Sequence, residues 1–175
     1  MTKSLILPVA GKSSRYPGMR PKWLLTMPDG KLMIEKSVEF FDLTKFTRIV
    51  VIALNEHIKK FTNKKILLQT LKKNISKKVE LVVLDKETTC QAETVMKGLI
   101  KSNIKGGFLI KDVDNIFYQK VEKRNVNQIT TINSKKIELL DAKSKSYINF
   151  DKMGTVTNIV EKKVISDHFC CGAYE

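Results

Sequence analysis

The sequence of 175 residues contains little cysteine and no long apolar run. Its three cysteines, Cys90, Cys170 and Cys171, form no disulfide framework, because the last two are adjacent and cannot readily pair with each other. This usage is typical of a reducing cytoplasm. No apolar stretch reaches the length of about 18 residues that a transmembrane helix needs, and residues 1–4 run directly into an expected strand without a signal-peptide pattern. We therefore expect a cytoplasmic protein that does not contact a membrane.

Histidine is also scarce, with only His57 and His168 in the chain. No Ser-His-Asp arrangement is evident, so we expect no chemistry that depends on a histidine base. His168 lies near Cys170 and Cys171, but these three residues have none of the spacings of a zinc site. A structural zinc ion is therefore not expected.

Acidic residues are outnumbered, with 18 against 32 basic ones and a net charge of +14. The excess is concentrated in residues 59–78, which hold eight lysines and no acidic residue. Apolar residues recur there at helical spacing, so we expect amphipathic helix with the lysines on its solvated face. No aromatic residues for base stacking accompany the lysines, and no helix-turn-helix or zinc-finger pattern occurs. Weak attraction to polyanions at low salt is expected, but not a nucleic-acid function.

Apolar strands and helical stretches alternate over the first two-thirds of the chain, and short strands dominate the rest. This order predicts an α/β protein whose central sheet is mostly parallel and flanked by helices. No repeat or low-complexity linker interrupts it, so we expect one domain, residues 1–175. The expected strands are 5–9, 48–53, 79–84, 107–111, 128–132, 137–140, 147–150, 155–160 and 169–174, and the expected helices are 33–41, the lysine-rich region and 92–101.

The most informative segment follows the first expected strand. The strand leads into a small turn, residues 10–14, which contains Gly11, and the cations Arg15 and Lys22 follow. A turn with accessible backbone N–H groups and two cations behind it is suited to binding a triphosphate. The members of the turn that we expect to contact a nucleotide are Ala10, Gly11, Lys12, Ser13 and Ser14. The alternative is an ordinary basic surface turn.

This turn is not a P-loop, although Gly11-Lys12-Ser13 matches the end of that signature. The first glycine of a P-loop would stand five positions before Gly11, where this sequence has Ile6. A P-loop also runs directly into a helix, whereas Pro17 and Pro21 forbid a regular helix here. The three spaced glycines of a dinucleotide-binding turn are missing too.

A second candidate site lies at the end of the expected strand 107–111. Asp112 and Asp114 follow that strand, and the turn after the first strand opens at the same edge of a parallel sheet, where ligands gather. Carboxylate oxygens are ligands that Mg²⁺ or Mn²⁺ prefers. The alternative is a solvated turn that ends the strand. With the phosphate-binding turn nearby, we expect at least one aspartate to hold a metal ion.

The order of these motifs resembles that of the nucleotidyltransferases that make sugar nucleotides. Gly11, Ser13 and Arg15, followed after five residues by Pro21-Lys22, are similar to the signature loop of that family, with Ser13 in place of its usual second glycine. Residues 114–117, Asp-Asn-Ile-Phe, resemble a segment of thymidylyltransferases whose aspartate binds the metal. The chain is most similar to nucleotidyltransferases of bacterial capsule and surface-polysaccharide clusters. The resemblance implies a nucleotidyltransferase-like, Rossmann-type domain of the glycosyltransferase-A kind.

The resemblance also implies sites for the nucleobase and the acceptor. Residues 89–95 are similar to the segment that reads the base in this superfamily, which makes Gln91 and Thr94 candidates, and a glutamine can match a pyrimidine edge. Cys90 stands where the family often has glycine. In the family, a strand that ends in Glu-Lys and a later glycine hold the acceptor sugar or its phosphate. The corresponding residues are Glu161, Lys162 and Gly172, and Lys163 replaces the usual proline.

The implied reaction transfers a nucleoside monophosphate from a nucleoside triphosphate, with a pyrimidine favoured, to a phosphorylated acceptor and releases pyrophosphate. Arg15 would stabilise the pyrophosphate, Lys22 the α-phosphate, and Asp114 with Asp112 the Mg²⁺ or Mn²⁺ ion. Related enzymes usually continue beyond the point that corresponds to Glu175 and carry a second metal-binding aspartate there. Either Asp112 serves as that ligand or the chain is a truncated form. The alternative functions are a metal-dependent glycosyltransferase that uses a nucleotide sugar and a non-catalytic nucleotide-binding domain. The resemblance also allows a homo-oligomer.

Overall fold

The computed structural model describes residues 3–12, 18–119 and 126–175, which fall into two compact units, Met1–Asn125 and Val126–Glu175. Ser13, Ser14 and Arg15 of the predicted phosphate loop lie outside the described residues. No helix that the structure describes has both the length and the apolar character needed to cross a membrane. The expectation of one domain over residues 1–175 stays a prediction, and we describe each unit by itself.

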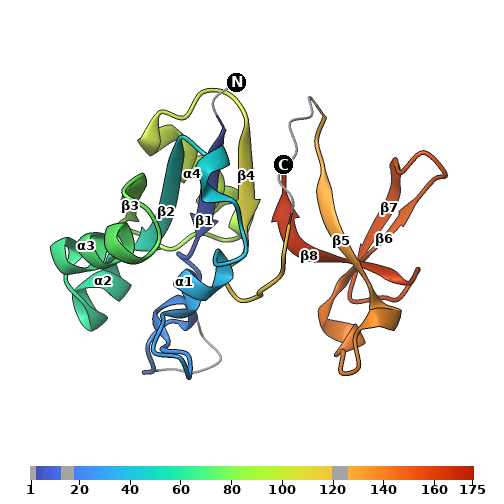
Figure 1. Ribbon diagram of the computed structural model, residues 1–175, viewed down its shortest axis with the longest axis horizontal. Helices are drawn as coiled ribbons and strands as arrows, with labels where there is room; N and C mark the ends of the chain where they lie inside the picture. Colours follow the sequence, from blue (N-terminus) through green and yellow to red (C-terminus); the bar gives the residue numbers. More distant parts are fainter. Residues whose placement is uncertain (1–2, 13–17, 120–125) are drawn as a thin grey trace. The chain divides into compact units, whose positions relative to one another are not determined.

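The described part of the first unit is built on four parallel strands, in the order β3-β2-β1-β4 (Figure 1). The strands are β1 (Ser4–Pro8), β2 (Arg48–Leu54), β3 (Val79–Leu84) and β4 (Phe108–Lys111). The two central strands, β1 and β2, are almost entirely buried apolar residues, the composition expected of a parallel sheet covered on both faces. The four strands predicted here are confirmed to within one residue at each end.

The helix α4 (Gln91–Ser102) packs against β1, β2 and β3. Its Gly98 lies so close to β2 that a Cβ atom at this position would be 2.0 Å from Cδ1 of Ile52. Ile52 belongs to a buried apolar cluster of the sheet and α4, together with Ile6, Ala10, Val50, Leu54, Leu84 and Val95. The close approach of α4 therefore depends on glycine at position 98.

The lysine-rich region forms two helices, α2 (Asn55–Phe61) and α3 (Lys64–Asn74). Asn63 separates them, because its side-chain oxygen accepts hydrogen bonds from the backbone N–H groups of Lys65 and Ile66 and so begins a new helix. The buried residues of α3 are Leu67 and Leu71, which lie on one face of the helix, and its lysines are exposed. The predicted solvated lysine face is thus present.

Between β1 and β2, residues 18–47 contain three short helices, η1 (Lys22–Leu24), α1 (Met33–Ser37) and η2 (Leu43–Lys45). The predicted helix 33–41 ends early, at Ser37, whose hydroxyl donates to the carbonyl oxygen of Ile34. Phe41 then pairs with Gln119 in a parallel bridge, which requires extended backbone. Buried Glu35 caps α1 through the N–H of Leu32 and accepts a hydrogen bond from Asn74 at the end of α3.

The second unit is an antiparallel sheet of four strands, in which β8 pairs with β5 and β6, and β6 pairs with β7 (Figure 1). The predicted strand 137–140 is wrong. Asn133 caps a 3₁₀ turn instead, by accepting a hydrogen bond from Lys135, and the chain leaves the sheet with Leu139 exposed. The predicted hairpin turn at 151–154 is confirmed, with Gly154 at a φ of +82°. The elements are β5 (Ile129–Asn133), η3 (Ser134–Lys136), η4 (Ala142–Ser144), β6 (Ser146–Phe150), β7 (Val156–Glu161) and β8 (His168–Tyr174).

Candidate functional site

The first candidate site lies where β1 and β4 end, at one edge of the parallel sheet. β1 leads into the loop that begins with residues 9–12, and β4 leads into the turn of residues 112–115. Lys22, at the start of η1, places its Nζ atom 3.4 Å from Oδ2 of Asp114. These residues are 92 positions apart in the sequence, so the fold itself brings the two predicted motifs together.

The described part of the predicted phosphate loop has an open main chain at its glycine. Val9 is anchored to β2, because its N–H donates to the carbonyl oxygen of Ile52 at 2.8 Å, and Ala10 is buried. Gly11 is exposed, and a Cβ atom there would meet no atom of the described residues within 4 Å. Packing against the described residues therefore does not require glycine at this position, whereas close approach by a ligand would favour it.

Lys12 is engaged by an acidic residue that sequence analysis did not single out. Its Nζ atom forms an ion pair with Oε2 of Glu87, and this partner raises the pKa of Lys12, with a smaller effect from Glu56. Glu56 is on α2 and Glu87 follows β3, so the lysine lies where the ends of β1, β2 and β3 meet. Lys12 keeps its positive charge next to the loop.

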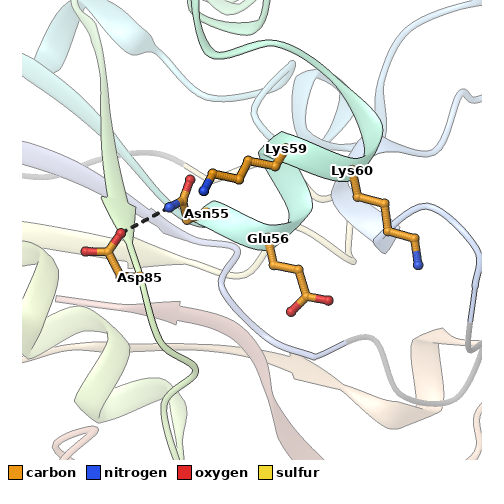
Figure 2. A pocket seen from close by; sticks show the side chains of 5 residues that line it. All are labelled: Asn55, Glu56, Lys59, Lys60 and Asp85. Carbon is orange, nitrogen blue, oxygen red and sulfur yellow. Dashed lines mark hydrogen bonds between the residues drawn. The ribbon is translucent and has the colours of Figure 1, made fainter.

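A shallow pocket of about 380 Å³ opens at the ends of β2 and β3 (Figure 2). Four of its side chains, Asn55, Glu56, Lys59 and Lys60, come from α2, and Asp85 follows β3. The amide of Asn55 donates to Oδ1 of Asp85 at 3.1 Å, the dashed line in Figure 2. Charges of both signs line this pocket, so it offers no uniform anion site.

The two aspartates of the 112–115 turn have different surroundings. Asp114 is exposed and contacts Lys22. Asp112 is half-buried, and its Oδ1 accepts a hydrogen bond from the amide of Gln91. Burial raises the pKa of Asp112, as does the nearby charge of Asp114, while the hydrogen bond from Gln91 opposes this shift. The fold thus joins the predicted base-reading residue directly to a predicted metal ligand.

The turn of residues 112–115 offers few metal ligands, which suits a cation that takes most of its ligands from water and from a substrate. No group of three or more histidine, cysteine or acidic side chains in the described part of the chain could hold a metal ion by itself. Two carboxylates on one turn, Asp112 and Asp114, match the way Mg²⁺ binds through one or two carboxylates together with water and substrate phosphates. The residues present therefore fit a metal ion that binds with a nucleotide.

The segment that precedes α4 is held in place by Glu93. Its Oε2 accepts hydrogen bonds from the N–H and the hydroxyl of Thr89, and Lys97 pairs with its other oxygen at 2.6 Å. These contacts lower the pKa of Glu93 to about 2, so the carboxylate stays charged. Thr94 is buried, and its hydroxyl contacts that of Thr88 and the carbonyl oxygen of Cys90. Gln91 is exposed and Thr94 is not.

The predicted acceptor residues all lie in the second unit. Glu161 ends β7 and pairs with the neighbouring Lys162 at 3.2 Å. Lys162 has a φ of +61°, and its N–H donates to the carbonyl oxygen of Lys145. Gly172 is in β8, with a φ of +82°, a conformation that favours glycine. Their part in an acceptor site stays a prediction.

Two residues of the first unit were given no role from the sequence. Lys111 ends β4 and is fully buried, and its Nζ donates to oxygens of the 112–115 turn. The alternation along β4 could have revealed it, because Lys111 falls two residues after the buried Leu109. Glu87 gave no such signal, since only the fold brings it to Lys12.

No protein-family model and no curated protein matches the sequence. Several solved structures share its fold. A nucleoside-diphosphate-sugar pyrophosphorylase from Vibrio cholerae RC9 has 22% identity and a TM-score of 0.76, over 97% of this chain and 71% of the other. The inositol-1-phosphate CTP transferase from T. maritima has 14% identity and a TM-score of 0.72, over 99% of this chain and 69% of the other. A CTP:phosphocholine cytidylyltransferase from Streptococcus pneumoniae has 19% identity and a TM-score of 0.63, over 99% of this chain and 69% of the other.

These matches span almost the whole chain and include both units. At these identities they establish the fold, and the predicted class is confirmed: a sheet with flanking helices, parallel in the first unit. The chain has the Rossmann-like fold of the sugar-phosphate nucleotidyltransferases.

Proposed function

We propose that this chain transfers a nucleoside monophosphate from a nucleoside triphosphate to a phosphorylated acceptor and releases pyrophosphate. The observation that carries the proposal is the contact of Lys22 with Asp114, next to the loop that leaves β1. It joins a cation suited to phosphate with a carboxylate suited to a metal ion. The pyrophosphorylase and cytidylyltransferases that share the fold support this chemistry.

In the proposed reaction an oxygen of the acceptor phosphate attacks the α-phosphorus of the nucleotide. The bond from that phosphorus to the oxygen bridging to the β-phosphate breaks, and pyrophosphate leaves with the bonding electrons. The attacking phosphate is already an anion at neutral pH, so the site needs no general base. It needs positioned reactants and neutralised charge, which cations and backbone N–H groups supply.

The residues that bind the triphosphate are proposed from the loop after β1. The main chain of residues 10–14 binds the β- and γ-phosphates, and the open space at Gly11 lets them approach closely. Lys12 adds positive charge beside the loop. Lys22 neutralises the charge that grows on the α-phosphate, and Arg15, outside the described residues, stabilises the leaving pyrophosphate.

Asp114, with Asp112, is proposed to bind Mg²⁺ or Mn²⁺. When bound, the ion would withdraw negative charge from the phosphates. In the structure Lys22 already lies against Asp114, so the same carboxylate orients the lysine toward the phosphates. The half-buried Asp112 is oriented by the amide of Gln91.

The identities of the base and the acceptor are finer proposals. Gln91 offers a donor and an acceptor to a pyrimidine, with Thr94 supporting the start of α4. Glu161, Lys162 and Gly172 of the second unit are proposed to bind the acceptor, which we take to be a sugar phosphate. The product would then be an activated sugar for surface-polysaccharide synthesis.

A pyrophosphate-release screen tests the proposal, with four nucleoside triphosphates against a panel of sugar phosphates and other phosphorylated acceptors. We expect one of the triphosphates to release pyrophosphate, and to do so only when both Mg²⁺ and an acceptor are present. Transfer from a nucleotide sugar without pyrophosphate release would instead identify a glycosyltransferase. That alternative uses Asp112 and Asp114 but gives no role to Lys22, which the structure places beside Asp114.

A thermal-shift measurement separates binding from turnover. A ligand at about 100 times its dissociation constant stabilises the folded state by about 2.7 kcal/mol. We therefore expect a triphosphate with Mg²⁺ to raise the melting temperature. Such stabilisation without any pyrophosphate release would support a non-catalytic nucleotide-binding domain.

A further inference from the structure

Lys111 is the last residue of β4, and its side chain has no exposed surface. Burial of an ammonium group is unfavourable unless protein oxygens or aromatic rings replace its water. A lysine at this position, on the same face of the strand as Leu109, therefore stands where an apolar residue would ordinarily pack. Its contacts show what the ammonium group does there.

The ammonium group of Lys111 binds oxygens at both ends of the turn of residues 112–115. Nζ donates to the carbonyl oxygen of Asp112, to the carbonyl oxygen of Asn115 at 3.0 Å, and to the side-chain oxygen of Asn115. One buried cation thus connects the two ends of a turn whose exposed member is Asp114. Movement of the turn would break several charge-assisted hydrogen bonds at once.

Two aromatic rings also contact the ammonium group, and one of them comes from a distant segment of the chain. Nζ lies 4.5 Å from the ring centre of Phe117 and 5.9 Å from that of Phe41. The two rings pack edge to face, with their centres 5.7 Å apart. Phe41 belongs to the segment after α1, so the lysine anchors the turn to a second part of the unit and not only to its own strand.

We infer that Lys111 is a positioning residue, whose buried ammonium group holds the turn of residues 112–115 in the conformation that presents Asp112 and Asp114 to a divalent cation. The inference rests on the proposed function, because it assigns those aspartates to a metal ion. Lys111 acts through the main chain of the turn and does not touch the reacting atoms.

The test compares wild-type protein with Lys111→Met, which keeps the length and volume of the side chain and removes its charge. Binding of Mn²⁺ alone is followed by electron paramagnetic resonance, without substrates. We expect the variant to bind Mn²⁺ at least tenfold more weakly than the wild type. In pyrophosphate release, the Mg²⁺ concentration for half-maximal rate should rise by a similar factor, with a much smaller change in kcat at saturating Mg²⁺.

Leu109→Ala is the matched control, because it removes buried side-chain volume from the same strand. It should lower the melting temperature but leave the affinity for Mn²⁺ within about twofold. Asn115→Ala is the second variant, in case Lys111→Met does not fold. It removes one of the oxygens that Lys111 binds and should weaken Mn²⁺ binding about threefold.

Three results would overturn the inference in distinguishable ways. If the wild type binds Mn²⁺ and the variants Lys111→Met and Asn115→Ala bind it as tightly, Lys111 does not position the turn. If Leu109→Ala loses as much affinity as Lys111→Met, the effect is one of general stability. If the wild type neither binds Mn²⁺ nor releases pyrophosphate, the proposed function itself fails.

Discussion

At the scale of single residues, the contact of Lys22 with Asp114 connects the two halves of the candidate site. Both side chains are partly exposed, with 38% and 52% of their surfaces accessible, so the ion pair itself adds little stability. In the proposed reaction its value lies in orientation, because the cation and the proposed metal-binding carboxylate would face the same phosphates. Loss of either should therefore affect the reaction far more than the fold.

Lys22→Met and Asp114→Asn should each lower the rate of pyrophosphate release by about 100-fold or more, the usual effect of removing a group that stabilises transition-state charge. Steady-state kinetics with saturating Mg²⁺ would measure this. Lys105→Met, at an exposed lysine of the same unit, is the control and should retain the wild-type rate. Full activity in both site variants would exclude the proposed roles.

The amide of Gln91 donates to Asp112, and the proposed role requires the same amide to face the base as well. Gln91→Leu should raise KM for the preferred triphosphate about tenfold and reduce the difference in KM between pyrimidine and purine triphosphates. Comparison of KM for all four nucleotides provides the measurement. An unchanged order of preference would mean that other residues read the base.

At the scale of secondary-structure elements, the packing of α4 on β2 positions Gln91 relative to β4. Gly98 allows this approach, and any larger residue would meet the fully buried Ile52. Arg48 makes an electrostatic link between β2, β3 and α4, because it binds both oxygens of Glu80 and the carbonyl oxygen of Ser102. Side-chain packing and charge-assisted hydrogen bonds therefore both stabilise the interface between α4 and the sheet.

Gly98→Ala should lower the free energy of unfolding by about 1–3 kcal/mol, because overpacking outweighs the better helix propensity of alanine. Urea denaturation measures the change. Gly107→Ala is the control, since a Cβ atom there meets no atom of residues 3–12, 18–119 and 126–175 within 4 Å, and it should shift stability by less than about 0.5 kcal/mol. Equal stability of the two variants would show that α4 can move away at little cost.

The hydrogen bonds from Arg48 lower the pKa of Glu80 below its usual value of 4.5. A carboxylate with a lowered folded-state pKa stabilises the protein fully above its unfolded-state pKa and loses that effect as the pH falls through the folded-state value. Glu80→Gln should therefore cost about 1 kcal/mol or less near pH 7, since both side chains are partly exposed. The difference from wild type should shrink below about pH 4.5.

Urea denaturation of both proteins between pH 3 and pH 7 would test this dependence. Glu138→Gln, at an exposed residue of the second unit, serves as the control. A stability difference that stays constant over this range would mean that the carboxylate of Glu80 carries no special stabilisation.

The elements of the first unit were predictable to different degrees, for physical reasons. Buried parallel strands are runs of apolar residues, so β2 and β3 were found almost to the residue. The break between α2 and α3 was missed because a single capping side chain, Asn63, outweighs a continuous helical pattern. The supposed strand 137–140 has the composition of a strand, but the structure offers it no partner within the second unit as described.

At the scale of the whole molecule, the topology makes a site from residues that are distant in the sequence. The approach of Lys22 to Asp114 could be anticipated, because parallel strands end at one edge of the sheet. The partnership of Lys12 with Glu87 could not, since it depends on how two loops meet. The predicted acceptor residues lie in the second unit. The screen for pyrophosphate release is therefore the experiment that identifies the acceptor.

The most direct test of the central claim follows the α-phosphorus of the nucleotide. A triphosphate labelled at that position is incubated with Mg²⁺ and a phosphorylated acceptor, and the products are separated and counted. The account predicts that the label joins the acceptor and that one pyrophosphate forms for each labelled product. Label found only in free nucleoside mono- or diphosphate, or left in the triphosphate with every acceptor, would contradict nucleotidyl transfer by this chain.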